Sequence, residues 1–127
     1  MRQIFIVAVA VAAFSSAAAA QSIPVRLSEW KLRLSRDTVA AGTVTFQVSN
    51  SGSVTHGFHV KGDGVDKATQ PIPPGQSASL TVTLKAGTYE VYCPMSEQSH
   101  KQAGMVAKLT VTGGGNESDA RRGSGSR

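Results

Sequence analysis

The sequence predicts an all-β fold, an antiparallel β-sandwich of the Greek-key type. Apolar and polar residues alternate with a period of two in several short runs, as expected of strands with one buried face. Glycine- and proline-containing turns separate these runs. About seven short strands joined by such turns are typical of an antiparallel sandwich. Residues 21–112, which contain all of these runs, are enough for one small domain but not for two.

The first half of this domain supplies four of the expected strands. In the first of them, Trp30, Leu32 and Leu34 lie on one face of the alternating pattern. The strands are separated by turn chemistry, such as the polar run that follows Asn50. We expect strands at residues 25–35, 38–40, 43–50 and 54–61.

The second half begins with a long irregular connection over residues 62–76, in which we expect a turn of helix near residues 65–69. A tight turn at Pro73-Pro74-Gly75 ends this connection. The remaining strands are expected at residues 77–85, 88–93 and 104–112.

The two ends of the chain are expected to be separate from the fold. Residues 1–20 carry Arg2, a short apolar stretch and an Ala-Ala-Ala run before Gln21, which is the pattern of a secretory signal peptide. This predicts a periplasmic or secreted protein, with the signal peptide either cleaved or kept as an anchor. Residues 113–127 are rich in Gly, Ser and charge, which predicts a disordered tail.

The charge of the domain argues against nucleic-acid binding. Residues 21–112 hold nine Lys or Arg and six Asp or Glu, a net charge of +3, and the basic residues are scattered along the chain. A modest positive charge favours encounters with acidic surfaces, so we expect redox protein partners with acidic docking surfaces, and a monomer without stable membrane insertion.

The single cysteine, Cys93, is the most informative residue for function. It cannot form an internal disulfide, and a free thiol in an oxidising compartment is a liability unless it is buried, paired or bound to a metal. His100 and Met105 follow it before the next expected strand. Copper accepts thiolate, imidazole and thioether donors together, whereas zinc and magnesium have little use for a thioether. The pattern therefore predicts a copper site.

A second histidine is needed, and the alternation of residues 54–60 selects it. His56 shares its face with Phe58 and Val60, whereas His59 lies on the opposite face. We therefore expect His56 at the inner end of the strand, beside the loops, and His59 at the surface.

These segments resemble the cupredoxins, the small blue-copper proteins that include plastocyanin and azurin. The resemblance rests on Asn50-Ser-Gly-Ser-Val-Thr-His56-Gly-Phe, on Tyr89-Glu-Val-Tyr-Cys93-Pro and on His100-Lys-Gln-Ala-Gly-Met105-Val. It implies a cupredoxin-like sandwich of seven or eight strands that binds one type 1 copper ion through His56, Cys93, His100 and Met105.

One departure concerns the loop between the second and third of these residues. Familiar members place two to four residues there, and this chain has six. The longer loop also holds Met95, which competes with Met105 for the axial position. Asn50 either hydrogen-bonds across to this loop or only closes a turn.

The function expected from these observations is electron transfer by a protein that is not an enzyme, since the acidic residues are dispersed and form no acid/base pair. His100, on its loop, is expected to reach the surface and pass electrons. The alternative is a copper-binding or copper-delivery protein of the same fold.

Overall fold

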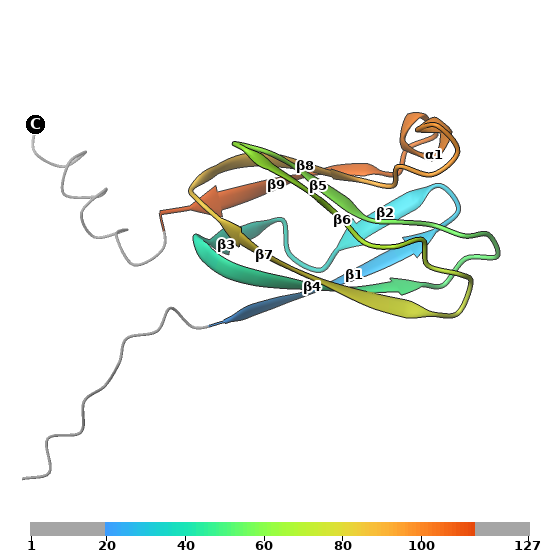
Figure 1. Cartoon of the computed structure of the whole chain (residues 1–127), viewed down its shortest axis with the longest axis horizontal. Coiled ribbons are helices and arrows are strands. Elements are labelled where there is room, and N and C mark those ends of the chain that lie inside the picture. The colour runs from blue at the N-terminus through green and yellow to red at the C-terminus, as the bar shows by residue number, and fades with distance from the viewer. Residues whose placement is uncertain (1–19, 114–127) are drawn as a thin grey trace, which may run out of the picture.

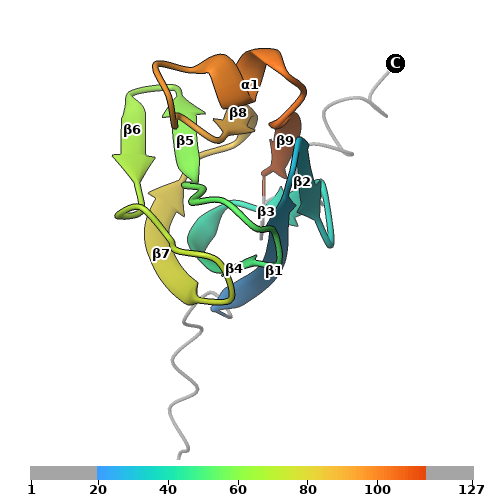
Figure 2. The ribbon, with the colours of Figure 1, turned by 90° about the vertical axis from the view of Figure 1, so that its right-hand side faces the viewer.

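A computed structural model describes residues 20–113 of the chain as two β-sheets that face each other (Figures 1 and 2). One sheet has four strands in the order β2-β1-β4-β7, and the other has five in the order β3-β9-β8-β5-β6. The elements are β1 (Gln21–Ser28), β2 (Lys31–Leu34), β3 (Thr38–Ala40), β4 (Gly42–Asn50), β5 (His59–Gly62), β6 (Val65–Ala68), β7 (Ser77–Leu84), β8 (Gly87–Tyr92), α1 (Ser99–Gln102) and β9 (Val106–Thr112).

The predicted sandwich is confirmed, but its sheets are mixed rather than purely antiparallel. β1 pairs in parallel with β4, and β3 pairs in parallel with β9, whereas all other pairs are antiparallel. The cause is the short strand β3, which belongs to the other sheet. Because the chain crosses over between β2 and β4, it returns beside β1 in the same direction.

The core lies between the two sheets and is formed by the inward positions of the alternating runs. In β4, Val44, Phe46 and Val48 are buried, as the alternation predicts. The ring of Phe46 packs against that of Phe58 with 4.9 Å between centroids. Burial of these apolar side chains is the main stabilising contribution for a domain of this size.

Three local expectations are wrong. Residues 25–35 form two strands separated by a turn, and Trp30 in that turn is 46% exposed. Residues 65–68 form strand β6 instead of a helical turn, because they pair with β5. The strand expected at residues 54–61 is regular only from His59 onward. The described residues thus form nine strands, and α1 is an addition to the expected elements.

The two ends of the sandwich differ. At one end lie α1 and the turn between β1 and β2, whereas β1 begins and β9 ends at the opposite end (Figure 1). The predicted signal peptide and the predicted tail lie outside the described residues, apart from Ala20 and Gly113. Within residues 20–113, no helix is both long and apolar enough to span a bilayer.

Candidate metal centre

Three side chains from two distant parts of the sequence meet at the α1 end of the sandwich. His56 lies in the connection between β4 and β5, Cys93 follows β8 directly, and His100 belongs to α1. The Nδ1 atoms of the two histidines are 3.3 Å apart, and the Cys93 Sγ atom lies 3.9 Å from Nδ1 of His56 and 3.6 Å from Nδ1 of His100. His56 and Cys93 are fully buried and His100 is 8% exposed.

His56 is held by hydrogen bonds to the segment before β7. Its backbone N–H donates to the Ile72 carbonyl at 3.1 Å, and its own carbonyl accepts from the Ile72 N–H at 2.7 Å. The buried Asn50 side chain donates to the carbonyls of Val54 and Ile72, at 2.9 and 2.8 Å. Asn50 therefore fixes the loop that carries His56. Of the two roles that the sequence allows for Asn50, closing a local turn agrees with these bonds, whereas a hydrogen bond to the loop after Cys93 does not.

Cys93 joins the same centre through its backbone and its sulfur. Its N–H donates to the Met105 carbonyl at 3.0 Å, so the strand pairing of β8 with β9 continues to the edge of the site. The Gly57 N–H donates to Sγ at 3.3 Å. This N–H therefore points at the sulfur atom that a metal would bind as thiolate.

His100 reaches the centre because the six-residue loop before it turns sharply. Ser96, Glu97 and Gln98 have φ values of 54°, 51° and 71°, in the left-handed region, and α1 begins immediately afterwards. The His100 carbonyl accepts from the Met105 N–H at 3.1 Å, which closes the loop against β9. The longer spacing is therefore taken up by a left-handed turn and one turn of helix.

The electrostatic surroundings keep His100 available as a ligand. Burial lowers its pKa, the nearby His56 lowers it further, and Glu29 opposes both effects. A neutral imidazole offers a lone pair to a metal ion, whereas an imidazolium does not. Ser96 Oγ lies 3.4 Å from Nε2 of His100, on the side of the ring away from Cys93.

Glu29 and Trp30, in the turn between β1 and β2, belong to the centre although nothing in the sequence signalled them. An oxygen of Glu29 lies 3.2 Å from Nε2 of His56. The pKa of Glu29 is lowered to about 2, mainly by the hydrogen bond from the Val54 N–H. Burial raises this pKa, and the hydrogen bond from the Ser53 N–H lowers it further. The Trp30 ring meets the His100 ring edge-on, with 4.9 Å between centroids. The period-two alternation of the sequence continues across this turn, so the sequence predicts one strand there and gives no sign that the two residues form a turn.

The other candidates lie as follows. Met105 is fully buried beside Cys93, and Met95 is half-buried, with its terminal methyl 3.1 Å from where a Cβ on Gly57 would stand. His59 is half-buried on the other side of the strand, where it pairs with Asp66 and stacks on Tyr92. His59 is thus separate from the three clustered donors.

The three clustered donors fit a metal ion of the size and preference of copper. Their ligand atoms all lie within 4.8 Å of one another. Bonds of about 2.0 to 2.3 Å to imidazole nitrogen and thiolate sulfur, arranged in a trigonal plane, require separations of about 3.5 to 3.8 Å. The observed 3.3, 3.6 and 3.9 Å scatter around that range. Two imidazoles and one thiolate are the equatorial donors of type 1 copper sites.

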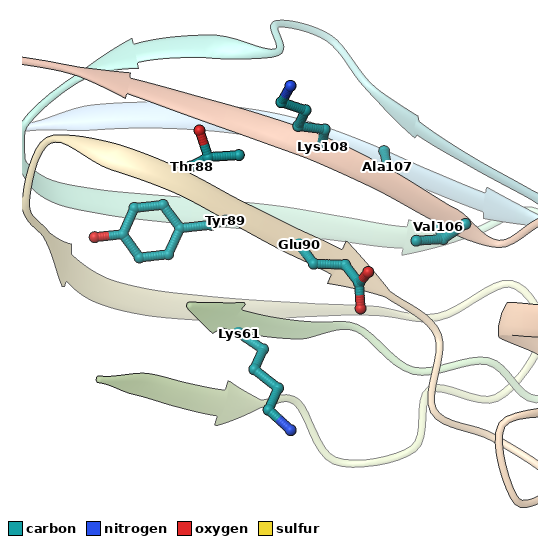
Figure 3. A pocket seen from close by; sticks show the side chains of 7 residues that line it. All are labelled: Lys61, Thr88, Tyr89, Glu90, Val106, Ala107 and Lys108. Carbon is teal, nitrogen blue, oxygen red and sulfur yellow. The ribbon is translucent and has the colours of Figure 1, made fainter. Parts of the chain in front are cut away.

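A separate hollow lies on the outer face of the five-stranded sheet (Figure 3). Its volume is about 520 Å³, and both positive and negative side chains line it. None of the three clustered donors belongs to it. The lining residues are Lys61, Thr88, Tyr89, Glu90, Val106, Ala107 and Lys108.

Comparison with known proteins supports the fold. The chain is similar to the reduced auracyanin of Roseiflexus castenholzii (22% identity, TM-score 0.62), over 72% of this chain and 97% of that one. It is similarly close to auracyanin A of Chloroflexus aurantiacus, a blue copper protein (22% identity, TM-score 0.60), over 73% and 99% of the two chains.

A blue copper oxidase of Nitrosomonas europaea is also similar (20% identity, TM-score 0.57), but the match spans 72% of this chain and only 38% of that one. At these identities, the TM-scores show a shared fold and nothing beyond it. No curated protein sequence matches the chain significantly.

The family assignment comes from the sequence itself. Residues 2–111 match the family described as cupredoxin-like domain, which is most of the chain. Fold, donor chemistry and sequence match thus agree, and this chain belongs to the cupredoxin-like domain family.

Proposed function

We propose that the chain is an exported mononuclear blue-copper protein that transfers electrons between redox partners. The observation that carries this proposal is the buried group formed by His56, Cys93 and His100, whose donor atoms are spaced for one metal ion. The auracyanin likeness supports it, because auracyanin A is itself a blue copper protein.

The residues that would hold the copper ion are His56, Cys93 and His100, with Met105 as a weaker thioether donor. A copper ion bound there would supply a one-electron couple between Cu(II) and Cu(I). The role of the protein is to keep the donors in place through that change. The connection between β4 and β5, the end of β8 and the short helix α1 hold these donors. In residues 20–113, every buried side-chain nitrogen and oxygen atom also has a hydrogen-bond partner. Such a preorganised site needs little rearrangement when the charge changes.

Electrons would leave the site at the α1 end, across Trp30. The sequence-based expectation was that the His100 ring edge reaches the surface, but that residue is only 8% exposed. The Trp30 ring lies against it and is 46% exposed. A partner that approaches this end therefore meets Trp30 before His100, and an apolar surface of this kind suits weak and short-lived docking.

The remaining parts of the proposal concern the setting of the protein. From the signal-peptide pattern we infer export to the periplasm or the cell exterior. From the net positive charge we infer redox partners with acidic surfaces, which the protein would meet as a monomer. We infer electron transfer rather than enzymatic turnover because the donors are buried, which leaves a substrate no direct approach to a bound metal.

Copper loading tests the site directly. Addition of Cu(II) to the metal-free protein should produce an intense visible thiolate-to-copper absorption, measured together with bound copper per chain. His56→Asn and Cys93→Ser should remove the colour, whereas His59→Asn should keep it, since His59 lies outside the cluster. A colourless wild-type protein after copper addition, or a blue Cys93→Ser variant, contradicts the proposal.

A second measurement separates the carrier from a copper-delivery protein. The burial of the donors favours a carrier, because an ion held by buried side chains leaves slowly. Cyclic voltammetry should therefore give a reversible one-electron couple, and a chelator should remove copper slowly from both oxidation states. Rapid loss of the cuprous ion to the chelator would favour delivery instead.

A further inference from the structure

The turn between β1 and β2 brings a carboxylate to the outer nitrogen of one candidate ligand. Oε1 of Glu29 lies 3.2 Å from Nε2 of His56. The same oxygen accepts the backbone N–H groups of Ser53 and Val54 at 2.7 and 2.9 Å. Glu29 thus joins the four-stranded sheet to the loop that carries His56, across 27 residues of sequence.

The loop is shaped to receive this carboxylate. A Cβ atom at Gly52 would lie 2.4 Å from Oε1 and 2.7 Å from Oε2 of Glu29, closer than any carbon atom can approach without displacement. Gly52 is also fixed by its N–H, which donates to the Asn50 side chain at 2.9 Å. Absence of a side chain at residue 52 is therefore a condition for the contact between Glu29 and the loop.

The contact determines which nitrogen of His56 carries hydrogen. A carboxylate can only accept hydrogen bonds, so Nε2 of His56 must be the donor. In a neutral imidazole the other nitrogen, Nδ1, then has a free lone pair, and Nδ1 is the atom that faces Cys93 and His100. Ligand histidines commonly have a carboxylate partner of this kind, which fixes the ring and makes it a stronger donor.

The second histidine has a different partner. Nε2 of His100 faces the hydroxyl oxygen of Ser96 at 3.4 Å, a neutral and longer contact. The two imidazoles are therefore unequal: one is backed by a negative charge and the other by a hydroxyl group.

We propose that Glu29 is a positioning residue, which selects the Nε2–H form of His56 and stabilises Cu(II) relative to Cu(I). This inference rests on the proposed function, because it assigns a role at the same copper centre. A negative charge beside the ligand favours the oxidation state with the higher positive charge. The reduction potential of the centre, with the electron supplied by an electrode, is therefore lower than it would be without Glu29.

Two substitutions separate the charge from the hydrogen bond. Glu29→Gln keeps an accepting oxygen and removes the charge, so the His56 tautomer should persist while the reduction potential rises. Glu29→Ala removes both, so the tautomer preference should also be lost and Cu(II) affinity should fall by about 10- to 100-fold. Gly52→Ala, which displaces the carboxylate, should raise the potential as Glu29→Gln does.

The control is Glu97→Gln, which removes an exposed carboxylate from the loop before His100. Its reduction potential should shift by less than that of Glu29→Gln. Equal shifts in the two variants would overturn the proposal, because the effect of Glu29 would then be no more than that of a nearby surface charge.

Nitrogen-15 NMR of the metal-free protein gives a readout that does not depend on copper. The wild-type protein should show hydrogen on Nε2 of His56, and Glu29→Ala should show a mixture of the two forms. Hydrogen on Nδ1 in the wild-type protein would overturn the inference. If the wild type failed to bind copper, the proposed function would fail, and the tautomer measurement would still decide the positioning role of Glu29.

Discussion

At the scale of single residues, Cys93 connects the two halves of the candidate site. Its backbone pairs with Met105, and its sulfur accepts the Gly57 N–H, one residue after His56. Cys93 is thus hydrogen-bonded to the segment that carries His56 through its sulfur and to Met105 through its backbone. This explains how a histidine 37 residues before Cys93 and one seven residues after it both come within 4 Å of its sulfur atom.

The axial position is tested by paired methionine substitutions. Met105→Leu keeps the burial of a fully buried side chain but removes the thioether, so the copper-loaded variant should stay blue with a higher reduction potential. Met95→Leu is the matched control and should leave the potential near that of the wild type. Voltammetry and electron paramagnetic resonance of both variants provide the measurement, and a larger shift in Met95→Leu would assign the axial role to that residue instead.

Trp30 offers a second test at this scale. Trp30→Ala uncovers the ring of His100, so a small anionic oxidant such as ferricyanide should approach more closely and oxidise the reduced protein faster. The intensity of the blue absorption should change little, because Trp30 is not a candidate ligand. Stopped-flow oxidation of wild type and variant measures the effect, and a rate that is unchanged or lower would show that Trp30 does not cover the exit.

Residue-level prediction from the sequence gave the right histidine, although His56 lies just before β5 and not within a regular strand. His56 and Phe58 are both buried, while His59 is half-buried and pairs with Asp66. Prediction failed for Glu29 and Trp30, since they form the turn of the β1–β2 hairpin and their role comes from tertiary contacts, such as that of Glu29 with the N–H groups of Ser53 and Val54. No local pattern carries that information.

At the scale of elements, the loop before α1 contains backbone strain that a substitution should relieve. Gln98 has φ of 71° and an exposed side chain, and the left-handed region costs a non-glycine residue roughly 1–2 kcal/mol. Gln98→Gly should stabilise the metal-free protein by up to about 1 kcal/mol, because part of the gain is offset by the greater freedom of glycine in the unfolded chain.

The control for this prediction is Gln102→Gly at the last residue of α1, which has no positive φ, so glycine should destabilise the protein by up to about 1 kcal/mol. Chemical denaturation of both variants gives the free energy of unfolding. If Gln98→Gly were as destabilising as Gln102→Gly, the left-handed turn would not be a source of strain.

Prediction of elements from the sequence succeeded for long alternating runs and failed for short ones. β4 and β7 alternate over eight or nine residues and lie where expected. β6 has four residues, of which only Val65 is a large apolar one, and it is a strand because β5 supplies hydrogen-bond partners. α1, also four residues long, is too short for helical periodicity to be visible.

At the scale of the whole molecule, copper should contribute to stability. An ion that binds the folded chain stabilises it by about 2.7 kcal/mol when its free concentration is 100 times the dissociation constant. For a domain of 60–100 residues this corresponds to a rise of roughly 10–20 °C in the unfolding midpoint. Differential scanning calorimetry with and without copper measures it, and Cys93→Ser should show a much smaller rise. Equal midpoints with and without copper in the wild type would contradict the prediction.

The fold class was predictable because it depends on the average pattern of many residues. The direction of individual strand pairs was not, since the crossover through β3 depends on which sheet a three-residue strand joins. The parallel pairing of β1 with β4 follows from the position of β3 in the other sheet, and no sequence pattern in β1 or β4 indicates it.

The position of the two ends of the sandwich determines how the molecule can be attached to something else. β1 begins and β9 ends at the end opposite to α1 (Figure 1). If either Gln21 or Thr112 were joined to an electrode by a linker or a crosslink, the α1 end, which carries the candidate copper ligands, would point away from the electrode. Immobilised in that orientation, the domain would exchange electrons with molecules in the surrounding liquid more readily than with its own support.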